Sequence, residues 1–151
     1  MSLVNIFDVA GSGMNAQTVR LNTTASNLAN AQTASSSIDQ VYRNRQPVFA
    51  QMQQQAMDQG SWGQEDGFGW EDEASGRGVQ VLGIVESDSP LERRFEPDHP
   101  QADEEGYVFY PNVNPVEEMT NMISASRSFQ MNVEVMNNAK QMVQRVLTLG
   151  Q

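Results

Sequence analysis

The chain has 151 residues, enough for one domain of ordinary size, but only 38% of them are hydrophobic. Its formal net charge is -10, which argues against non-specific nucleic-acid binding, because that affinity comes mainly from Lys and Arg neutralising phosphates. There is no cysteine, which excludes a disulfide framework, a thiol nucleophile and thiolate metal ligands. The modest apolar fraction predicts that partners supply part of the stabilising surface.

The N-terminal stretch lacks a positively charged start and an unbroken apolar run. It therefore predicts neither a cleavable secretory signal nor a membrane span. If the protein leaves the cytoplasm, we expect another route to carry it.

Apolar residues near the N-terminus recur at alternating steps of four and three. This spacing predicts a helix with a narrow seam along one side, as in a coiled coil. Gly11 and Gly13 lie in the same stretch, and each costs about 1 kcal/mol relative to Ala, so the helix needs a partner. The seam positions are Leu3, Phe7, Ala10, Met14, Gln17, Leu21, Thr24 and Leu28.

The C-terminal part repeats the pattern more strongly. Asn114 can cap a helix there, Pro115 suits its first position, and Glu117 is placed to reach back to the cap. The sequence thus predicts a long second helix. Its seam positions are Met119, Met122, Ser126, Phe129, Val133, Met136, Lys140, Val143 and Leu147.

Between the helices the sequence changes to β and loop patterns. Residues 40–54 are typical of an extended segment, although Pro47 argues against a central strand. A β-branched run at 79–85 and an aromatic run at 107–110 predict a small β-hairpin or three-stranded unit. The segment 51–76 is an expected acidic, Gly-rich loop that carries Trp62, Phe68 and Trp70.

These elements together predict a mainly α fold with a small β insert. The two terminal helices pair as a coiled-coil-like axial domain. The expected division is 1–36 for the first helix and its linker, 37–112 for the β-rich insert and 113–151 for the second helix.

Several longer stretches resemble the family of flagellar rod and hook axial proteins. They read LNTTASNLANAQT near the N-terminus, GIVESDSP and PDHPQADEEGYVFYPNVN in the middle, and NPVEEMTNMISASRSFQMNVEVMNNAKQMVQRVLTLGQ at the end. The SNLANAQT element indicates the wider family, and the last two stretches narrow the resemblance to its proximal rod subunits. The chain departs from the family pattern at TASSSIDQVYRNR and at 51–76.

The resemblance implies a structural, non-enzymatic subunit of the proximal rod of the bacterial flagellar basal body, which polymerises into a hollow, torque-transmitting tube. Such subunits are exported by the flagellar type III apparatus without cleavage, and their ends order as helices on assembly. The implied partners are copies of itself, other rod proteins, membrane ring or rod-adaptor components and the export apparatus. Neither nucleic acid, nor direct membrane insertion, nor a cofactor is implied.

We expect the assembly contacts to lie on the two helix seams. Asn27 and Asn30 are either polar helix surface or inter-subunit hydrogen-bonding groups. The predicted interface residues are Phe7, Met14, Leu21, Asn27, Leu28, Asn30, Met122, Phe129, Val133, Met136, Val143 and Leu147.

Other functions are open at this point. The seams could form the core of one helical hairpin, and the chain could be a soluble coiled-coil adaptor or export chaperone that never polymerises. A carboxylate-dependent hydrolase would use Asp98, Asp103 and Glu105, but their crowding in one turn gives no defined pair separation. His99 between two prolines is typical of a structural turn, and Trp62 and Trp70 could contact a neighbouring component.

Overall fold

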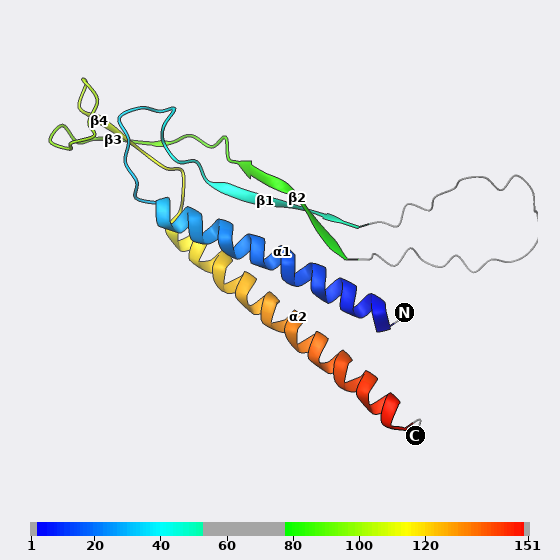
Figure 1. Ribbon diagram of the computed structural model, residues 1–151. Coiled ribbons are helices and arrows are strands. Elements are labelled where there is room, and N and C mark those ends of the chain that lie inside the picture. Colours follow the sequence, from blue (N-terminus) through cyan, green and yellow to red (C-terminus); the bar gives the residue numbers. More distant parts are fainter. Residues whose placement is uncertain (1–2, 53–77, 150–151) are drawn as a thin grey trace, which may run out of the picture.

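The computed structural model describes residues 3–52 and 78–149. It contains two long helices, α1 (Leu3–Asn30) and α2 (Pro115–Leu149), which run antiparallel along an elongated molecule (Figure 1). The predicted helix pair with β structure between its two members is confirmed. The expected loop at 51–76, with its three aromatic residues, lies almost entirely outside the described residues.

The start of α2 follows the predicted signals. The backbone N–H of Val116 donates to Asn114 Oδ1 at 3.1 Å, and that of Glu118 donates to the Asn114 carbonyl at 3.0 Å. Pro115 occupies the first helical position, where its missing N–H costs nothing. The expected reach of Glu117 back to the cap is not formed, since no hydrogen bond among the described residues involves its carboxylate.

Within the described residues, the β structure consists of two separate two-stranded antiparallel sheets. Strand β1 (Arg45–Gln51) pairs with β2 (Val79–Glu86), and β3 (Glu92–Phe95) pairs with β4 (Tyr107–Tyr110). The two runs predicted to pair with each other therefore belong to different sheets, which corrects that part of the sequence prediction. Pro47 is tolerated in β1 because both strands of a two-stranded sheet are edge strands.

The sheets occupy different places along the helix pair. Strands β1 and β2 pack on α1, on the side away from α2, whereas β3 and β4 lie beyond the end where α1 finishes and α2 begins (Figure 1). A single bridge between Ser35 and Phe109 ties the loop after α1 to β4. Helix α1 is thus the middle layer of the molecule.

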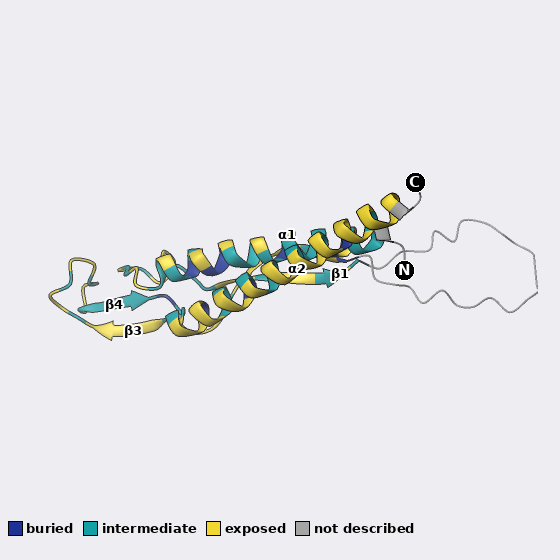
Figure 2. Ribbon diagram, turned by 90° about the horizontal axis from the view of Figure 1, so that it is seen from below, coloured by how far each residue is buried: buried dark blue, intermediate teal, exposed yellow. Residues whose placement is uncertain are grey.

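The core is thin and contains small residues (Figure 2). On the helices the buried apolar side chains are all alanine, which leaves little apolar surface to stabilise the chain by itself. Four polar residues are also buried. The buried apolar residues among those described are Ala10, Ala16, Val41, Val108, Pro111, Ala125 and Ala139, and the buried polar ones are Thr23, Thr24, Asn27 and Glu118.

Candidate assembly interface

The two helices approach each other closely at Gly13. A Cβ atom added to this glycine would lie 2.8 Å from Nδ2 of Asn132 on α2, closer than ordinary van der Waals contact. Glycine at position 13 therefore allows the two helices to come this close, although glycine in a helix interior is otherwise destabilising. A Cβ at Gly11, by contrast, would meet nothing within 4 Å.

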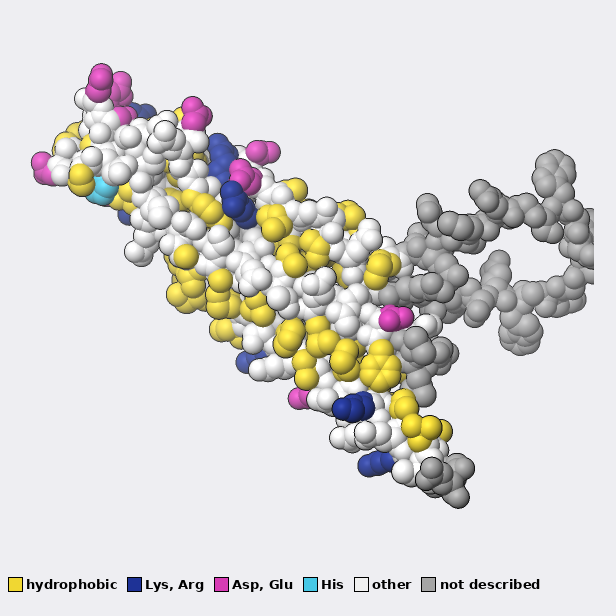
Figure 3. All heavy atoms as spheres, viewed as in Figure 1, with side chains coloured by type: hydrophobic (Ala, Val, Ile, Leu, Met, Phe, Trp, Pro, Cys, Tyr) yellow, Lys and Arg dark blue, Asp and Glu magenta, His cyan; other side chains and the backbone are white. Residues whose placement is uncertain are grey.

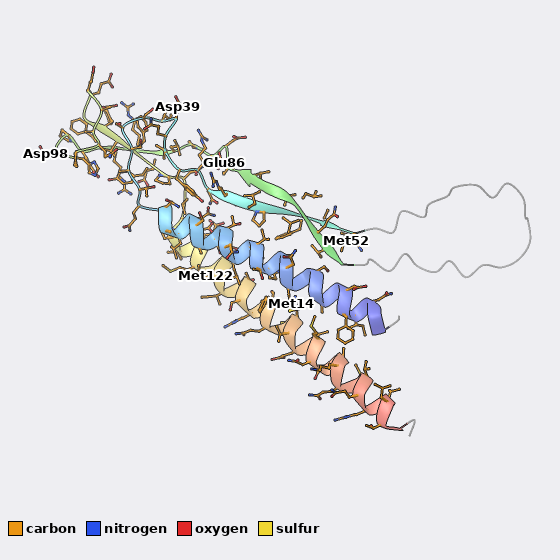
Figure 4. The ribbon with its side chains drawn as sticks, in the orientation of Figure 1. Met14, Asp39, Met52, Glu86, Asp98 and Met122 are labelled. Atoms are coloured by element: carbon orange, nitrogen blue, oxygen red, sulfur yellow. The ribbon has the colours of Figure 1, made fainter. Side chains whose placement is uncertain are left out.

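The predicted seam residues flank this contact rather than fill its centre. Ala125, Asn132 and Ala139 repeat at seven-residue spacing, and Asn132 meets Gly13 of α1. Figure 4 labels Met14 on α1 and Met122 on α2, both beside the line where the helices meet. Of the predicted apolar set, all but Leu147 are half-buried, namely Phe7, Met14, Leu21, Leu28, Met122, Phe129, Val133, Met136 and Val143.

Asn27 is the centre of a buried polar cluster, with 1% of its surface exposed. Its Nδ2 donates to the Arg45 carbonyl at 2.8 Å, to Asn44 Oδ1 at 2.9 Å and to Glu118 Oε2 at 3.1 Å. Its Oδ1 accepts from the Tyr42 hydroxyl at 2.8 Å and from the Arg45 backbone N–H at 3.0 Å. One side chain thus joins α1, the start of β1 and the start of α2.

Two further asparagines extend the cluster. Asn44 donates from Nδ2 to Glu118 Oε1 at 3.3 Å, and its backbone N–H donates to Asn112 Oδ1 at 2.8 Å. Asn112 donates in turn to the carbonyls of Ser87 and Ser89 after β2. Because buried polar groups need partners, this network fixes how the β1–β2 sheet sits on the helix pair.

Sequence reasoning missed most of this cluster. No sequence pattern singles out Glu118, whereas in the structure this residue is 2% exposed and hydrogen-bonded to two asparagines. Asn27 was singled out, but for contacts with other subunits. In the structure its amide hydrogen bonds all lie within the chain, and Asn30 donates to the Ser26 carbonyl of its own helix at 2.8 Å. The spacing of asparagines along the sequence gives no signal of their convergence.

Large apolar side chains are exposed along α2, most of them off the line of Ala125, Asn132 and Ala139 that meets α1. Val146 continues that line toward the C-terminal end. The exposed apolar residues recur mainly at intervals of three, four or seven, which places them in a stripe that winds slowly around the helix. Figure 3 shows hydrophobic side chains over the first turns of α2 and again toward its C-terminal end. We call this set the outer stripe, and it comprises Val116, Met119, Ile123, Met131, Val135, Met142 and Val146.

The acidic turn near β4 has a structural role. Asp103 Oδ1 accepts from the backbone N–H groups of Glu105 and Tyr107, and His99 Nδ1 accepts from that of Gln101. Within residues 3–52 and 78–149 no three His, Cys, Asp or Glu residues come together as metal ligands. Neither described helix is both long and apolar enough to cross a membrane.

Arginine and aromatic side chains cover the β3–β4 sheet. The Arg93 guanidinium lies 3.5 Å from the Tyr107 ring centre, and that of Arg94 lies 4.8 Å from the Tyr110 ring centre. Desolvation, followed by the hydrogen bond from its hydroxyl to Glu96 Oε2, raises the pKa of Tyr110 above its usual value. These arginine–aromatic contacts stabilise the small sheet together with Val108 of β4, which is fully buried.

Comparison with known proteins shows one consistent likeness. Residues 7–34 match the family model described as flagella basal body rod protein, and residues 104–149 match the C-terminal model of flagellar basal body rod FlgEFG proteins. The chain is 46% identical to the flagellar basal-body rod proteins FlgC of Yersinia enterocolitica and Salmonella typhimurium, over the whole of both chains. It is 35% identical to that of Borreliella burgdorferi, covering 100% of this chain and 99% of the relative. The two matched segments contain most of α1 and α2, the elements that carry the candidate interface.

Proposed function

Because this chain belongs to the FlgC family of flagellar basal-body rod proteins, we propose that the outer stripe of α2 is the surface by which it packs against neighbouring subunits of the rod. The chain is a structural subunit of the rod, and its place is the flagellar basal body. A soluble adaptor or chaperone is not favoured by this membership.

The observation that carries the proposal is the exposure of large apolar side chains on α2. Met131 is 64% exposed and Val135 is 46% exposed, although each would gain free energy by leaving water. Groups of exposed large apolar side chains mark interaction sites on soluble proteins. In a rod, a neighbouring helix would cover it.

The half-buried seam residues support the same role. Side chains such as Met14 and Met122 flank the α1–α2 contact, so a helix from a neighbour could cover their exposed parts while the pair stays intact. Methionine adapts to differently shaped neighbours, which suits contacts with copies of this chain and with other rod proteins. We therefore propose that the seam residues form a second part of the interface with neighbouring subunits.

The wider role follows from family membership. We infer that the packed helix pairs form a hollow tube that transmits torque, with the β-rich middle part, 37–112, outside the axial helices. We further propose that the flagellar type III apparatus exports the chain without a cleavable signal. The same proposal includes contacts with ring components and the absence of enzymatic activity. The turn-forming role of Asp103 and His99 supports a structural rather than a catalytic chain.

Substitutions on α2 test the proposal. Met131→Glu combined with Val135→Glu places two carboxylates at exposed positions of the outer stripe, so the chain should fold but leave the rod incomplete. The matched control is Asn137→Glu with Gln141→Glu, two exposed residues at the same spacing on another side of α2. The measurements are motility and the amount of the chain in purified hook–basal bodies.

The expected result is loss of motility and of rods with the first pair, and near-normal rods with the second. Circular dichroism of both purified variants should show unchanged helix content. Normal basal bodies carrying Met131→Glu and Val135→Glu would contradict the assignment of the outer stripe. Phe129→Asp or Met136→Asp should also prevent assembly, but these positions are half-buried, so their effect includes damage within the chain.

A further inference from the structure

Among the described residues, every exposed methionine belongs to the outer stripe of α2. Met131 is 64% exposed, and Met119 and Met142 are each 50% exposed. Methionine thus supplies three of the seven residues of the outer stripe. The half-buried methionines are Met14, Met52, Met122 and Met136.

Methionine is the only sulfur-containing residue type in this chain, because there is no cysteine. A hydroperoxide oxidises a thioether in a single two-electron step. A lone pair of the sulfur attacks one peroxide oxygen, the O–O bond breaks and the S–O bond of a sulfoxide forms. With hydrogen peroxide, the other oxygen takes the proton of the transferred oxygen and leaves as water, so sulfur is oxidised and peroxide is reduced.

Oxidation would change the character of the outer stripe. A sulfoxide is polar and accepts hydrogen bonds, whereas the thioether is apolar and adapts its shape to its neighbours. Residues four apart lie side by side on a helix, and each exposed methionine has an apolar stripe residue at this spacing. These pairs are Met119 with Ile123, Met131 with Val135 and Met142 with Val146.

A sulfoxide in the stripe would oppose the packing of a neighbouring subunit. Covering the stripe removes its side chains from water, and an acceptor that loses water without gaining a donor is destabilising. Three such acceptors along one helix would act together. The same cover would keep peroxide away from the sulfur atoms of a subunit that has already assembled.

We propose that Met119, Met131 and Met142 form an oxidation site of the unassembled chain, where hydroperoxides convert the outer stripe from an assembly surface into a polar surface that the rod rejects. The proposal rests on the rod function proposed above, because oxidation at these positions matters only where neighbours cover the stripe. Assembled subunits are protected at all three sulfur atoms.

Peroxide labelling tests the site. The purified full chain and intact hook–basal bodies are treated separately with dilute hydrogen peroxide, and peptide mass spectrometry follows the sulfoxide at each methionine. Met122 and Met136 are matched controls, since they are half-buried methionines of the same helix. In the purified chain the three exposed methionines should react several times faster than these controls, and in rods this difference should disappear.

The outcomes separate the inference from the rod function. Equal rates at exposed and half-buried methionines of the purified chain would overturn the inference and leave the rod function standing. Fast oxidation of the three positions inside rods would show that the outer stripe is uncovered there, and would contradict both the inference and the proposed packing surface.

Two triple variants test the effect on assembly. Glutamine at positions 119, 131 and 142 resembles the sulfoxide in length and polarity, and leucine at the same positions keeps the side chains apolar. Hook–basal bodies should contain about tenfold less of the glutamine variant than of the leucine variant, at equal helix content in circular dichroism. Equal amounts of the two variants in hook–basal bodies would overturn the inference.

Discussion

Replacing Asn27 by alanine should destabilise the chain strongly, although the substitution removes only one small side-chain amide. The substitution removes the acceptor of the Arg45 backbone N–H and a donor to the Glu118 carboxylate, both inside the molecule. A buried polar group without a partner costs about 1–3 kcal/mol, while alanine gains roughly 0.5 kcal/mol in helix propensity over asparagine. Two such groups, less the gain in helix propensity, give an expected net loss in the free energy of unfolding of about 1.5–5.5 kcal/mol.

Urea unfolding of the purified chain, followed by the helix signal in circular dichroism, measures this loss. Asn15→Ala is the matched control, because Asn15 is an exposed residue of the same helix. It should change the free energy of unfolding by no more than about 0.5 kcal/mol, in the stabilising direction. Equal effects of Asn27→Ala and Asn15→Ala would refute the view that the buried cluster stabilises the fold. A double-mutant cycle with Glu118→Gln should give a coupling energy of about 1 kcal/mol.

Two further predictions concern local contacts. Gly11→Ala should stabilise the unassembled chain by about 1 kcal/mol, because nothing lies within 4 Å of the new methyl group. Gly13→Ala should stabilise it less, because the Asn132 side chain must move to make room. Equal gains in the free energy of unfolding, measured in urea, would contradict the close approach of the two helices at Gly13. Glu96→Gln should lower the pKa of Tyr110 toward its usual value, measured by tyrosinate absorbance against a Tyr110→Phe reference. The raised pKa contributes stability at neutral pH that disappears as the pH rises through the pKa of the folded state, and an unchanged titration would disprove the part assigned to Glu96.

The helices could be predicted from the sequence because their signals are local. The three-and-four spacing and the Asn114–Pro115 start depend on neighbouring residues, and the structure has both helices where the pattern indicates. The centre of their contact was harder to predict. A search for large apolar residues finds the flanks of the interface, whereas the closest approach uses Gly13 and small alanines such as Ala125.

Strand pairing and the polar cluster depend on contacts between distant parts of the chain. Strand β3 has the sequence ERRF, without apolar alternation, so its pairing with β4 had no pattern to reveal it. Strands β1 and β2 pair although residues 53–77 separate them in the sequence, because both strands pack on α1. The buried state of Glu118 likewise depends on Asn27, which lies 91 residues away in the sequence.

We propose above that the outer stripe of α2 packs against neighbouring subunits in the rod. A cryo-EM reconstruction of the rod in purified hook–basal bodies tests it most directly. Met131 and Val135 should be covered by side chains of neighbouring subunits, with Gly13 still against Asn132 of its own chain. A reconstruction in which the outer stripe of this chain faces solvent or the open channel would contradict it.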